Sequence, residues 1–474
     1  MCTVFAEAVQ KNPEHSLIDV TSAASLPVSK ERLLTEIHLY EADGTLRTGA
    51  DAVLTALAAS YSFLRPLRTL VRLPFLKPVA NIVYNFVSKR RTHFFGGVKA
   101  RLYWLFILTI LGTGLGVILS WPLWGVERAY PTIPVSEVLL AITGLTPVLT
   151  LLLLATLTLG LLTYRRFSLL ATIILVMLIS LILLDLSRLQ PWIFHYLLLF
   201  GLFSFWSLKD SANQSKILDA ARVLIASIYF WSGFQKLNTA FFLEIFPWFT
   251  GPLWSPFGDT GAYAVIVIGV FIPFVEMAFA IGLLTKRFRM ISIVASFCML
   301  VLVIFTLTFV HDWNSVVWPW NVIIFLMVLV LFYKSDTNFP IIFKNLKKSF
   351  LALPLLIFCL LIPLGNIFGY SHHYLAWSLY SGRVPTAEII ASPTTLATLP
   401  GYTRKEDDKI TTLPFAFFSL ASVNVPPYPE VWYFTRAFEY LCTHFGDDEA
   451  LRLAITERDF FLSHRKTETI YTCE

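Results

Sequence analysis

The chain has 474 residues, of which 56% are hydrophobic and 14% charged, and its formal net charge is +6. Its mean hydropathy of +0.67 lies outside the range of soluble globular proteins and predicts a mainly α-helical polytopic membrane protein. The positive charge does not indicate a nucleic-acid partner, because Lys and Arg gather in short clusters beside apolar runs, where they set membrane orientation.

The region of residues 1–95 precedes every apolar run that is long enough to cross a bilayer. Its pattern predicts a strand, a hairpin that turns at Asp43-Gly44 and a helix, at residues 15–22, 37–49 and 50–60 respectively. No signal-peptide pattern opens the chain, so we expect this small α/β domain to stay in the cytosol.

Nine apolar runs of about twenty residues follow, each long enough to cross the hydrocarbon core. They cover residues 103–123, 140–163, 167–186, 191–207, 217–238, 262–285, 288–310, 316–333 and 349–369. Lys and Arg concentrate before the first run and after the second, fourth, sixth and eighth. The positive-inside rule then predicts a multi-pass protein of the cell membrane, with residues 96–370 as the membrane domain, the N-terminus in the cytosol and the C-terminus outside.

Residues 371–474 are predicted to form a small external α+β domain. Strands are expected at 386–392, 414–423 and 467–473, and a helix at 429–445. Cys442 and Cys473 lie in this domain, where oxidation is permitted, and form either a disulfide or two buried thiols. Cys298 and Cys359 lie inside apolar runs and are expected to pack in the core.

The fifth apolar run ends in YFWSGFQKLN, residues 229–238, which places a lysine near the external membrane face. Helical spacing puts Arg222, Ala226, Tyr229, Gly233 and Lys236 on one stripe, whose small residues admit a neighbouring helix. Lys236 is either a functional cation or a side chain that extends to the lipid headgroups.

Other polar residues are expected near Lys236. Glu276 lies in the middle of a run, where a carboxylate must bind a proton or a cation. Residues 241–260 have the composition of a folded lid or interfacial loop. We further expect Asn238, His311, Asp312, Asn314, Trp320 and Asn321 at the same membrane face. The alternative for the Trp-rich segment is an ordinary interfacial belt.

The text DGTLRTGAD at residues 43–51, followed by Ala52, resembles the DCC-type thiol-disulfide oxidoreductases, which have a thioredoxin-like fold. In that family an Asp-Cys-x-x-Cys motif supplies an attacking and a resolving thiol. This chain opens MCTVFAEAVQK, so Cys2 matches the second cysteine of the motif. Either the reading frame extends upstream and restores the redox pair, or the domain is an incomplete scaffold.

Residues 95–385 resemble the horizontally transferred transmembrane (HTTM) domain, the membrane part of vitamin K-dependent γ-carboxylase, and more distantly the DoxX-like proteins. The resemblance rests on YFWSGFQKLN, on Glu276 before GLL and on WPWN. It implies that Lys236 is the base that deprotonates a reduced quinone. Asn238 stands where the carboxylase has Asp, and the C-terminal region matches no peptide-binding portion, so protein carboxylation is not expected.

We therefore predict a membrane redox protein that binds an isoprenoid quinone and no metal, coupled to thiol-disulfide exchange. The predicted catalytic residues are Lys236, His311, Asp312 and Cys2, with Arg222, Tyr229, Asn238, Glu276, Asn314, Trp320 and Asn321 around the substrate. The expected partners are a membrane lipid or quinone and a protein at the external domain. The alternative is a non-catalytic membrane scaffold or assembly factor that presents this domain, and a transporter ranks third because no internal repeat is present.

Overall fold

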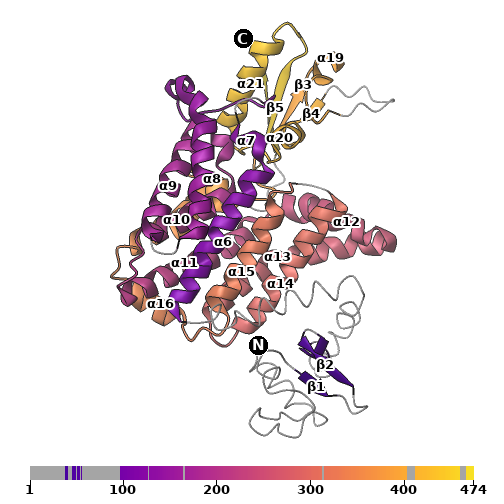
Figure 1. Ribbon diagram of the computed structural model, residues 1–474. Coiled ribbons are helices and arrows are strands. Elements are labelled where there is room, and N and C mark those ends of the chain that lie inside the picture. The colour runs from indigo at the N-terminus through magenta and orange to yellow at the C-terminus, as the bar shows by residue number, and fades with distance from the viewer. Residues whose placement is uncertain are drawn as a thin grey trace. The chain divides into compact units, whose positions relative to one another are not determined.

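The computed structural model describes residues 38–40, 45–49, 51–53, 55, 97–125, 128–163, 166–311, 314–402, 412–458 and 466–473. The chain divides into two compact units, Met1–Gly96 and Gly97–Glu474. Figure 1 labels the helices and strands of both units.

The first unit contains an antiparallel hairpin of β1 (His38–Tyr40) and β2 (Leu46–Thr48), with His38 opposite Thr48. This confirms the hairpin predicted at residues 37–49. Residues 51–53 and 55 are helical, as expected for the segment after the hairpin. Cys2 and the strand predicted at residues 15–22 lie outside the described residues.

The second unit is mainly helical, and a helical segment coincides with each of the nine predicted apolar runs. Among the residues that the structure describes, six segments are long and apolar enough to cross a membrane: Val98–Leu119 (α6), Glu137–Leu162 (η2 and α8), Phe167–Leu184 (α9), Ser211–Gln235 (α11), Phe241–Leu284 (η4 to α13) and Arg289–Val310 (α14 and η6). Three are shorter: Pro191–Ser204 (α10), Val317–Phe332 (α15) and Ala352–Ile367 (α17, η7 and α18). The count of nine spans and their orientation stay predictions.

Burial separates central from peripheral helices. In α11 72% of the apolar window is buried inside the protein, against 17% in η2–α8 and 22% in α14–η6. Helix α11, which ends in the YFWSGFQKLN stretch, is therefore surrounded by other helices, whereas α14 leaves much of its surface exposed. Cys298 is exposed on α14, so its predicted core packing is wrong, and Cys359 is half-buried.

The C-terminal part contains a four-stranded antiparallel sheet in the order β4-β3-β5-β6. Its strands are β3 (Thr386–Ile390), β4 (Thr412–Pro414), β5 (Arg452–Arg458) and β6 (Lys466–Thr472). Helix α21 (Val431–Phe445) precedes the β5–β6 hairpin, and a disulfide joins Cys442 of this helix to Cys473 after β6, with the two Cα atoms 5.6 Å apart.

The strand predicted at residues 414–423 is wrong, because Phe415–Val423 forms helix α20. The residues that α20 buries are Phe415, Phe418, Ser419 and Val423, which recur at the three-and-four spacing of a helix face. Closely spaced phenylalanines concealed this period in the sequence.

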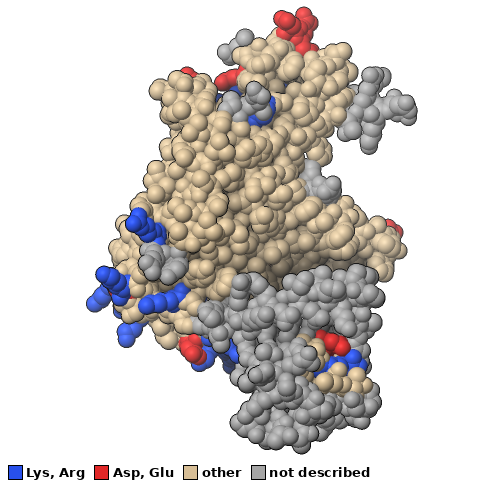
Figure 2. Space-filling view, viewed as in Figure 1, with Lys and Arg blue, Asp and Glu red and all other residues tan. Residues whose placement is uncertain are grey.

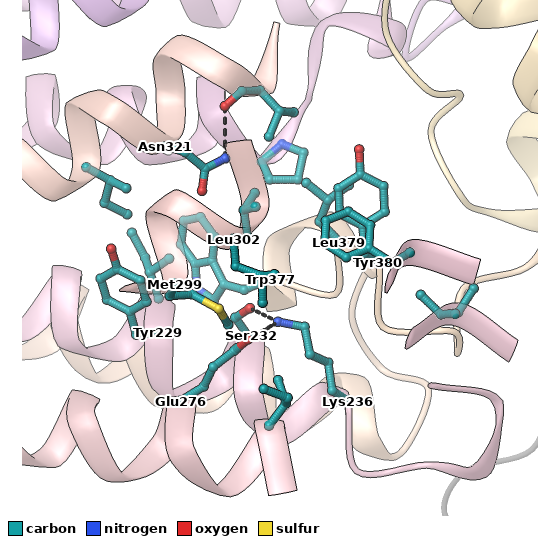
Figure 3. Close-up of a pocket in the computed structure, with 18 of the residues that line it drawn as sticks. Tyr229, Ser232, Lys236, Glu276, Met299, Leu302, Asn321, Trp377, Leu379 and Tyr380 are labelled. Atoms are coloured by element: carbon teal, nitrogen blue, oxygen red, sulfur yellow. Dashed lines mark hydrogen bonds and ion pairs between the residues drawn. The ribbon is translucent and has the colours of Figure 1, made fainter. Parts of the chain in front are cut away.

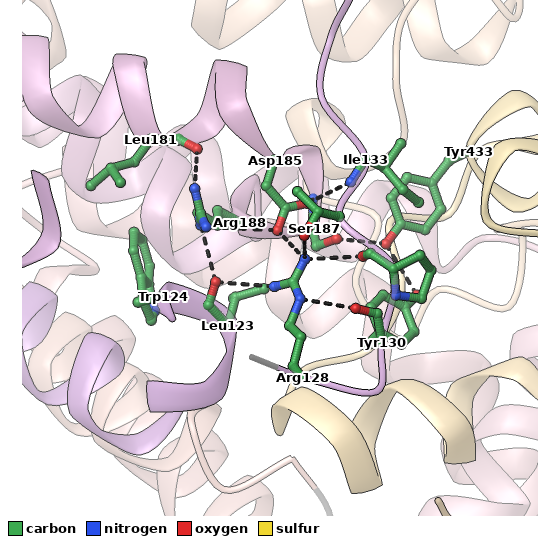
Figure 4. Close-up of polar contacts among 12 residues, drawn as sticks. Leu123, Trp124, Arg128, Tyr130, Ile133, Leu181, Asp185, Ser187, Arg188 and Tyr433 are labelled. Carbon is green, nitrogen blue, oxygen red and sulfur yellow. Dashed lines mark hydrogen bonds and ion pairs between the residues drawn. The ribbon is translucent and has the colours of Figure 1, made fainter. Parts of the chain in front are cut away.

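A buried polar network joins α21 to the connections between the apolar helices (Figure 4). Tyr433 of α21 shares a hydrogen bond of 2.8 Å with Ser187 and donates one of 3.0 Å to Tyr130. Beside them Arg128 donates to the fully buried carboxylate of Asp185 at 2.5 Å. Because each polar group has a partner, this network holds the C-terminal part against the helices without leaving an unpaired buried charge.

Candidate functional site

The site centres on Lys236, which caps the C-terminal end of α11. Its Nζ atom donates to both carboxylate oxygens of Glu276, at 2.6 and 2.7 Å, and to Ser232 Oγ at 3.0 Å. The side chains are 12% exposed for Lys236 and 2% exposed for Glu276. Figure 3 shows the lysine pointing from α11 toward the carboxylate on α13 (Gly258–Leu284). The mid-span carboxylate is thus held by a cation from the neighbouring helix.

Gly233 explains how α11 and α13 approach closely enough for this pair. A Cβ atom at Gly233 would lie 2.7 Å from the carbonyl oxygen of Pro273 and 2.9 Å from Glu276 Cβ. Both distances are shorter than any real Cβ contact, so a larger residue would push the helices apart. The predicted stripe of small residues on α11 therefore faces α13 at the level of the ion pair.

A cavity of about 130 Å³ opens beside the pair. Its wall is mostly apolar and aromatic, with side chains from α11, α13, α14, α15 and residues 377–380. Its polar lining residues are Tyr229, Ser232, Lys236, Glu276, Asn321 and Tyr380. Apolar protein cavities of about 150 Å³ bind a benzene ring. The cavity therefore suits one flat six-membered ring.

Four of the predicted site residues line the cavity together with Lys236: Tyr229, Glu276, Trp320 and Asn321. The indole Nε1 of Trp320 donates to Nδ1 of the buried His195 at 3.2 Å, which fixes the ring against the wall. Asn321 donates to its own helix at Val317 O. The structure thus brings residues from the fifth, sixth and eighth apolar runs to one place.

Three further predicted residues lie near the cavity but do not line it. Asn238 is buried and donates to the backbone oxygens of Gln235 and Ser381, at 2.9 and 2.8 Å. Asn314 donates to the hydroxyl of the lining residue Tyr380 at 3.1 Å. The Nε2 atom of His311 lies 3.1 Å from Phe249 O, and its ring stacks on Trp248. Asp312 lies outside the described residues, as does Cys2.

Arg222 lies at the other end of α11, away from the cavity. It donates to Asp219 at 2.6 Å and to Leu331 O, at the C-terminal end of α15, at 3.0 Å. Arg101 and Arg289 donate to other carbonyl oxygens at or after that end. Arginines from three helices thus satisfy carbonyl groups that a helix end leaves unpaired.

The segment at residues 377–383, which sequence reasoning missed, closes one side of the cavity. Trp377 and Tyr380 both line it, and both adopt positive φ, 64° and 56°. Arg383 donates to Gln235 Oε1 at 2.9 Å, one residue before Lys236. The sequence WSLYSGR, residues 377–383, shortly after the last apolar run, was an available signal, since aromatic and polar residues in an ordered loop often form sites.

The predicted lid at residues 241–260 is folded, but as helix. It forms η4 (Phe241–Ile245), α12 (Phe246–Trp254) and η5 (Ser255–Phe257) and continues into α13. Its residues Phe241, Ile245 and Phe246 line the cavity. Glu244 between them forms ion pairs with Arg458 at 2.6 Å and Lys466 at 3.0 Å. The C-terminal hairpin therefore holds one wall of the cavity.

The ion pair places a cation and a carboxylate side by side in the wall of a mostly apolar cavity. Within the described residues no cluster of three or more metal-ligating side chains occurs.

These features define a class, a polytopic helical protein of membrane type with an amine–carboxylate pair in an aromatic cavity. Residues 1–97 match the family model of the DCC1-like thiol-disulfide oxidoreductases. This match confirms the resemblance predicted for the N-terminal region, and with the apolar helices it indicates a membrane protein of redox type. No curated protein and no solved structure matches the chain.

Proposed function

We propose that the chain is a multi-pass membrane redox protein of the combined DCC and HTTM class whose cavity binds the ring of an isoprenoid quinone. In this proposal Lys236 is the base, and residues 1–97 carry out thiol-disulfide exchange in the cytosol. One observation carries it: the ammonium of Lys236 donates a hydrogen bond to the carboxylate of Glu276 in the wall of a cavity of about 130 Å³, close to the size that binds one aromatic ring.

The lining chemistry supports a quinone-like ring. Aromatic side chains such as Phe241, Trp320 and Trp377 offer flat apolar contacts. Few hydroxyl and amide groups line the cavity, among them those of Tyr229, Tyr380 and Asn321. Pockets that bind apolar ligands likewise have a small number of polar groups that orient the ligand. A long isoprenoid tail would remain among the apolar helix surfaces.

The base role follows from the pair. In its amine form Lys236 accepts a proton from a ring hydroxyl, while Glu276 retains the proton that it received from the lysine. Lys236→Arg keeps a cation beside Glu276, but a guanidinium cannot act as a base near neutral pH. Lys236→Met removes both the positive charge and the base, whereas Lys236→Arg removes the base alone. Comparison of the two variants therefore separates the effect of charge from the effect of proton transfer.

The proposed coupling between quinol and thiols balances in electrons and protons. A quinol carries two electrons and two protons, which is what reduction of one disulfide to two thiols consumes. Cys2 is the one cysteine in residues 1–97 of the chain. As the thiolate, Cys2 would attack a substrate disulfide, forming a mixed disulfide and releasing one thiol, and the two electrons and two protons of the quinol would then reduce the mixed disulfide to two thiols.

The test uses the full chain in lipid nanodiscs. Isoprenoid quinone retained on purification is measured by chromatography, and thiol release from dithiobis-nitrobenzoate is followed with decylubiquinol as reductant. Lys236→Arg should bind quinone and lose at least about 100-fold in rate, the usual loss when a general base is removed. The exposed Lys209 supplies the control Lys209→Arg, which should match the unaltered protein.

Two outcomes would contradict the proposal. Unchanged quinol-dependent turnover in Lys236→Arg removes the base role. Preparations that retain no quinone and do not take it up remove the ligand.

A second candidate is a scaffold that presents the C-terminal part to a protein partner. The observation that favours it is the buried Tyr433–Ser187–Tyr130 network, which holds that part rigidly on the helices. For a scaffold, the double variant Lys236→Met/Glu276→Gln would fold and retain partner binding, and no quinone would co-purify.

A further inference from the structure

A second cavity, here called the α16 groove, lies on another face of α11. Its volume is about 490 Å³. It is bounded by α11, by α13, by α16 (Phe339–Leu346) and by the segment of α17 (Ala352–Leu356) and η7 (Ile357–Leu361). Its α11 residues include Val223, Ala226 and Phe230, whereas Tyr229, Ser232 and Lys236 line the cavity described above. The two sites share helices α11 and α13 but no lining residue.

The groove requires no polar ligand. Its polar lining residues on α11, Ser227 and Trp231, both donate to the carbonyl oxygen of Cys359, at 3.1 and 2.8 Å. These bonds satisfy a carbonyl in the π-helical segment η7, where the ordinary helical pattern is interrupted. Because these two polar groups of α11 are already paired, the groove offers hydrocarbon contact along about 12 Å of α11, from Val223 to Trp231.

One end of the groove is closed by the short amphipathic helix α16. Ile342 and Leu346 are buried, while Phe339 and Phe343 line the groove and remain 54% and 57% exposed. Asn345 donates to Asp219 of α11 at 2.8 Å and so fixes the helix in place. Half-exposed phenylalanines on an amphipathic helix are typical of an interface between protein and lipid.

The same end is positively charged. Lys344, Lys347 and Lys348 are exposed, and Lys347 itself lines the groove. The sequence contains no Asp or Glu between Asp336 and Glu388. Figure 2 shows Lys and Arg gathered at the end of the helical unit where α16 lies, on a surface that otherwise carries little charge in this view.

We propose that the α16 groove binds one anionic glycerophospholipid, with an acyl chain in the groove and the phosphate beside Lys344, Lys347 and Lys348. The apolar groove matches the chain, and the lysine cluster at its end matches the phosphate. A basic residue near an anionic lipid surface contributes about 5-fold in affinity. This site is independent of the proposed quinone chemistry.

The test measures lipid binding by native mass spectrometry, after extraction of the full chain from vesicles of equal phosphatidylglycerol and phosphatidylcholine. Lys344→Gln/Lys347→Gln should lower the preference for phosphatidylglycerol about 25-fold, because each of the two lysines contributes a factor of about 5. The control Lys209→Gln/Lys286→Gln removes the same charge from exposed lysines that do not line the groove and should keep the preference.

A second variant, Ala352→Trp, fills the groove at a half-buried lining position and should reduce the number of tightly bound lipids by one. The proposal is overturned if the two lysine pairs behave alike, since the charge effect would then be general. It is also overturned if Ala352→Trp keeps the full lipid count, or if the mass shows a dimer that Ala352→Trp dissociates, because the occupant would then be a second copy of the chain.

Discussion

Removal of one partner of the Lys236–Glu276 pair should destabilise the helical unit more than removal of both. At 2.6 Å and an effective dielectric constant of about 20, the attraction is on the order of 6 kcal/mol. Desolvation of two ions offsets much of it, so the net contribution of the pair relative to an uncharged one is small. A single substitution, by contrast, leaves a buried charge without its partner.

The expected magnitudes follow. Lys236→Met leaves Glu276, which is 2% exposed, without its cation and should cost about 3–5 kcal/mol. Glu276→Gln should cost a similar amount, while the double variant should lie within about 1 kcal/mol of the unaltered protein. The double-mutant cycle then gives a coupling of at least about 5 kcal/mol.

The assay is unfolding of the full chain in nanodiscs, followed by intrinsic tryptophan fluorescence. The control is Lys286→Met, which breaks an exposed ion pair with Asp336 at 3.6 Å and should change stability by less than about 0.5 kcal/mol. If Lys236→Met unfolds like Lys286→Met, the charge is not buried against a partner and the reasoning about the site fails.

Two further predictions concern the C-terminal part. Gly382 has φ of 79°, and a Cβ atom there would lie 2.9 Å from Phe241 N, so Gly382→Ala should lower unfolding stability by about 1–3 kcal/mol; an unchanged melting temperature would contradict the close contact. Partial burial acts to raise the pKa of Asp448, but hydrogen bonds from Ser392, Thr395 and Ala450 outweigh it and lower that pKa from 3.8 to about 2. Its stabilising contribution is therefore present above about pH 4 and lost as the pH falls toward 2, so Asp448→Asn should be less stable at pH 7, by under about 1 kcal/mol after solvent screening, and equal at pH 2. If Asp448→Asn and the unaltered protein were equally stable at both pH values, this prediction would be contradicted.

The apolar helices could be predicted because the hydrocarbon core leaves a single apolar segment no alternative to helical structure. Backbone groups in a bilayer must bond within their own segment, so a run of about twenty apolar residues predicts a helix whatever its neighbours are. The hairpin at residues 37–49 could also be predicted from a local signal, since the Asp43-Gly44 sequence favours a tight turn. The C-terminal part lacks such a constraint, and there short aromatic runs such as 414–423 gave the wrong period.

The segment predicted as a lid, residues 241–260, shows a second limit of prediction from sequence. Prolines in residues 241–260 favoured a loop, yet Pro247 lies at the second position of α12, directly after the π-helical segment η4. Pro252 is tolerated inside the same short helix. Composition alone could not separate a loop from a helix that contains prolines.

At the site, sequence reasoning found the participants but not their arrangement. Lys236 and Glu276 lie 40 residues apart, and the sequence does not state which helices are neighbours. The spacing of Gly233 and Lys236 did indicate a close helix contact on that stripe. Asn238 was chosen for its polarity, but its side chain bonds to backbone oxygens, joining the end of α11 at Gln235 to the distant segment at Ser381, a role that motif comparison does not reveal.

The kind of cation differs between the helix ends and the proposed reactive position. At the helix ends the buried cations are arginines: Arg101 and Arg289 bond to backbone oxygens, and Arg222 bonds to a backbone oxygen and to the carboxylate of Asp219. A guanidinium also stays protonated at any physiological pH, so these contacts are chemically inert. At the cavity the cation is a lysine, and its partner is a carboxylate that can take the proton. The base role that we propose would require a lysine here, because a guanidinium cannot give up its proton near neutral pH.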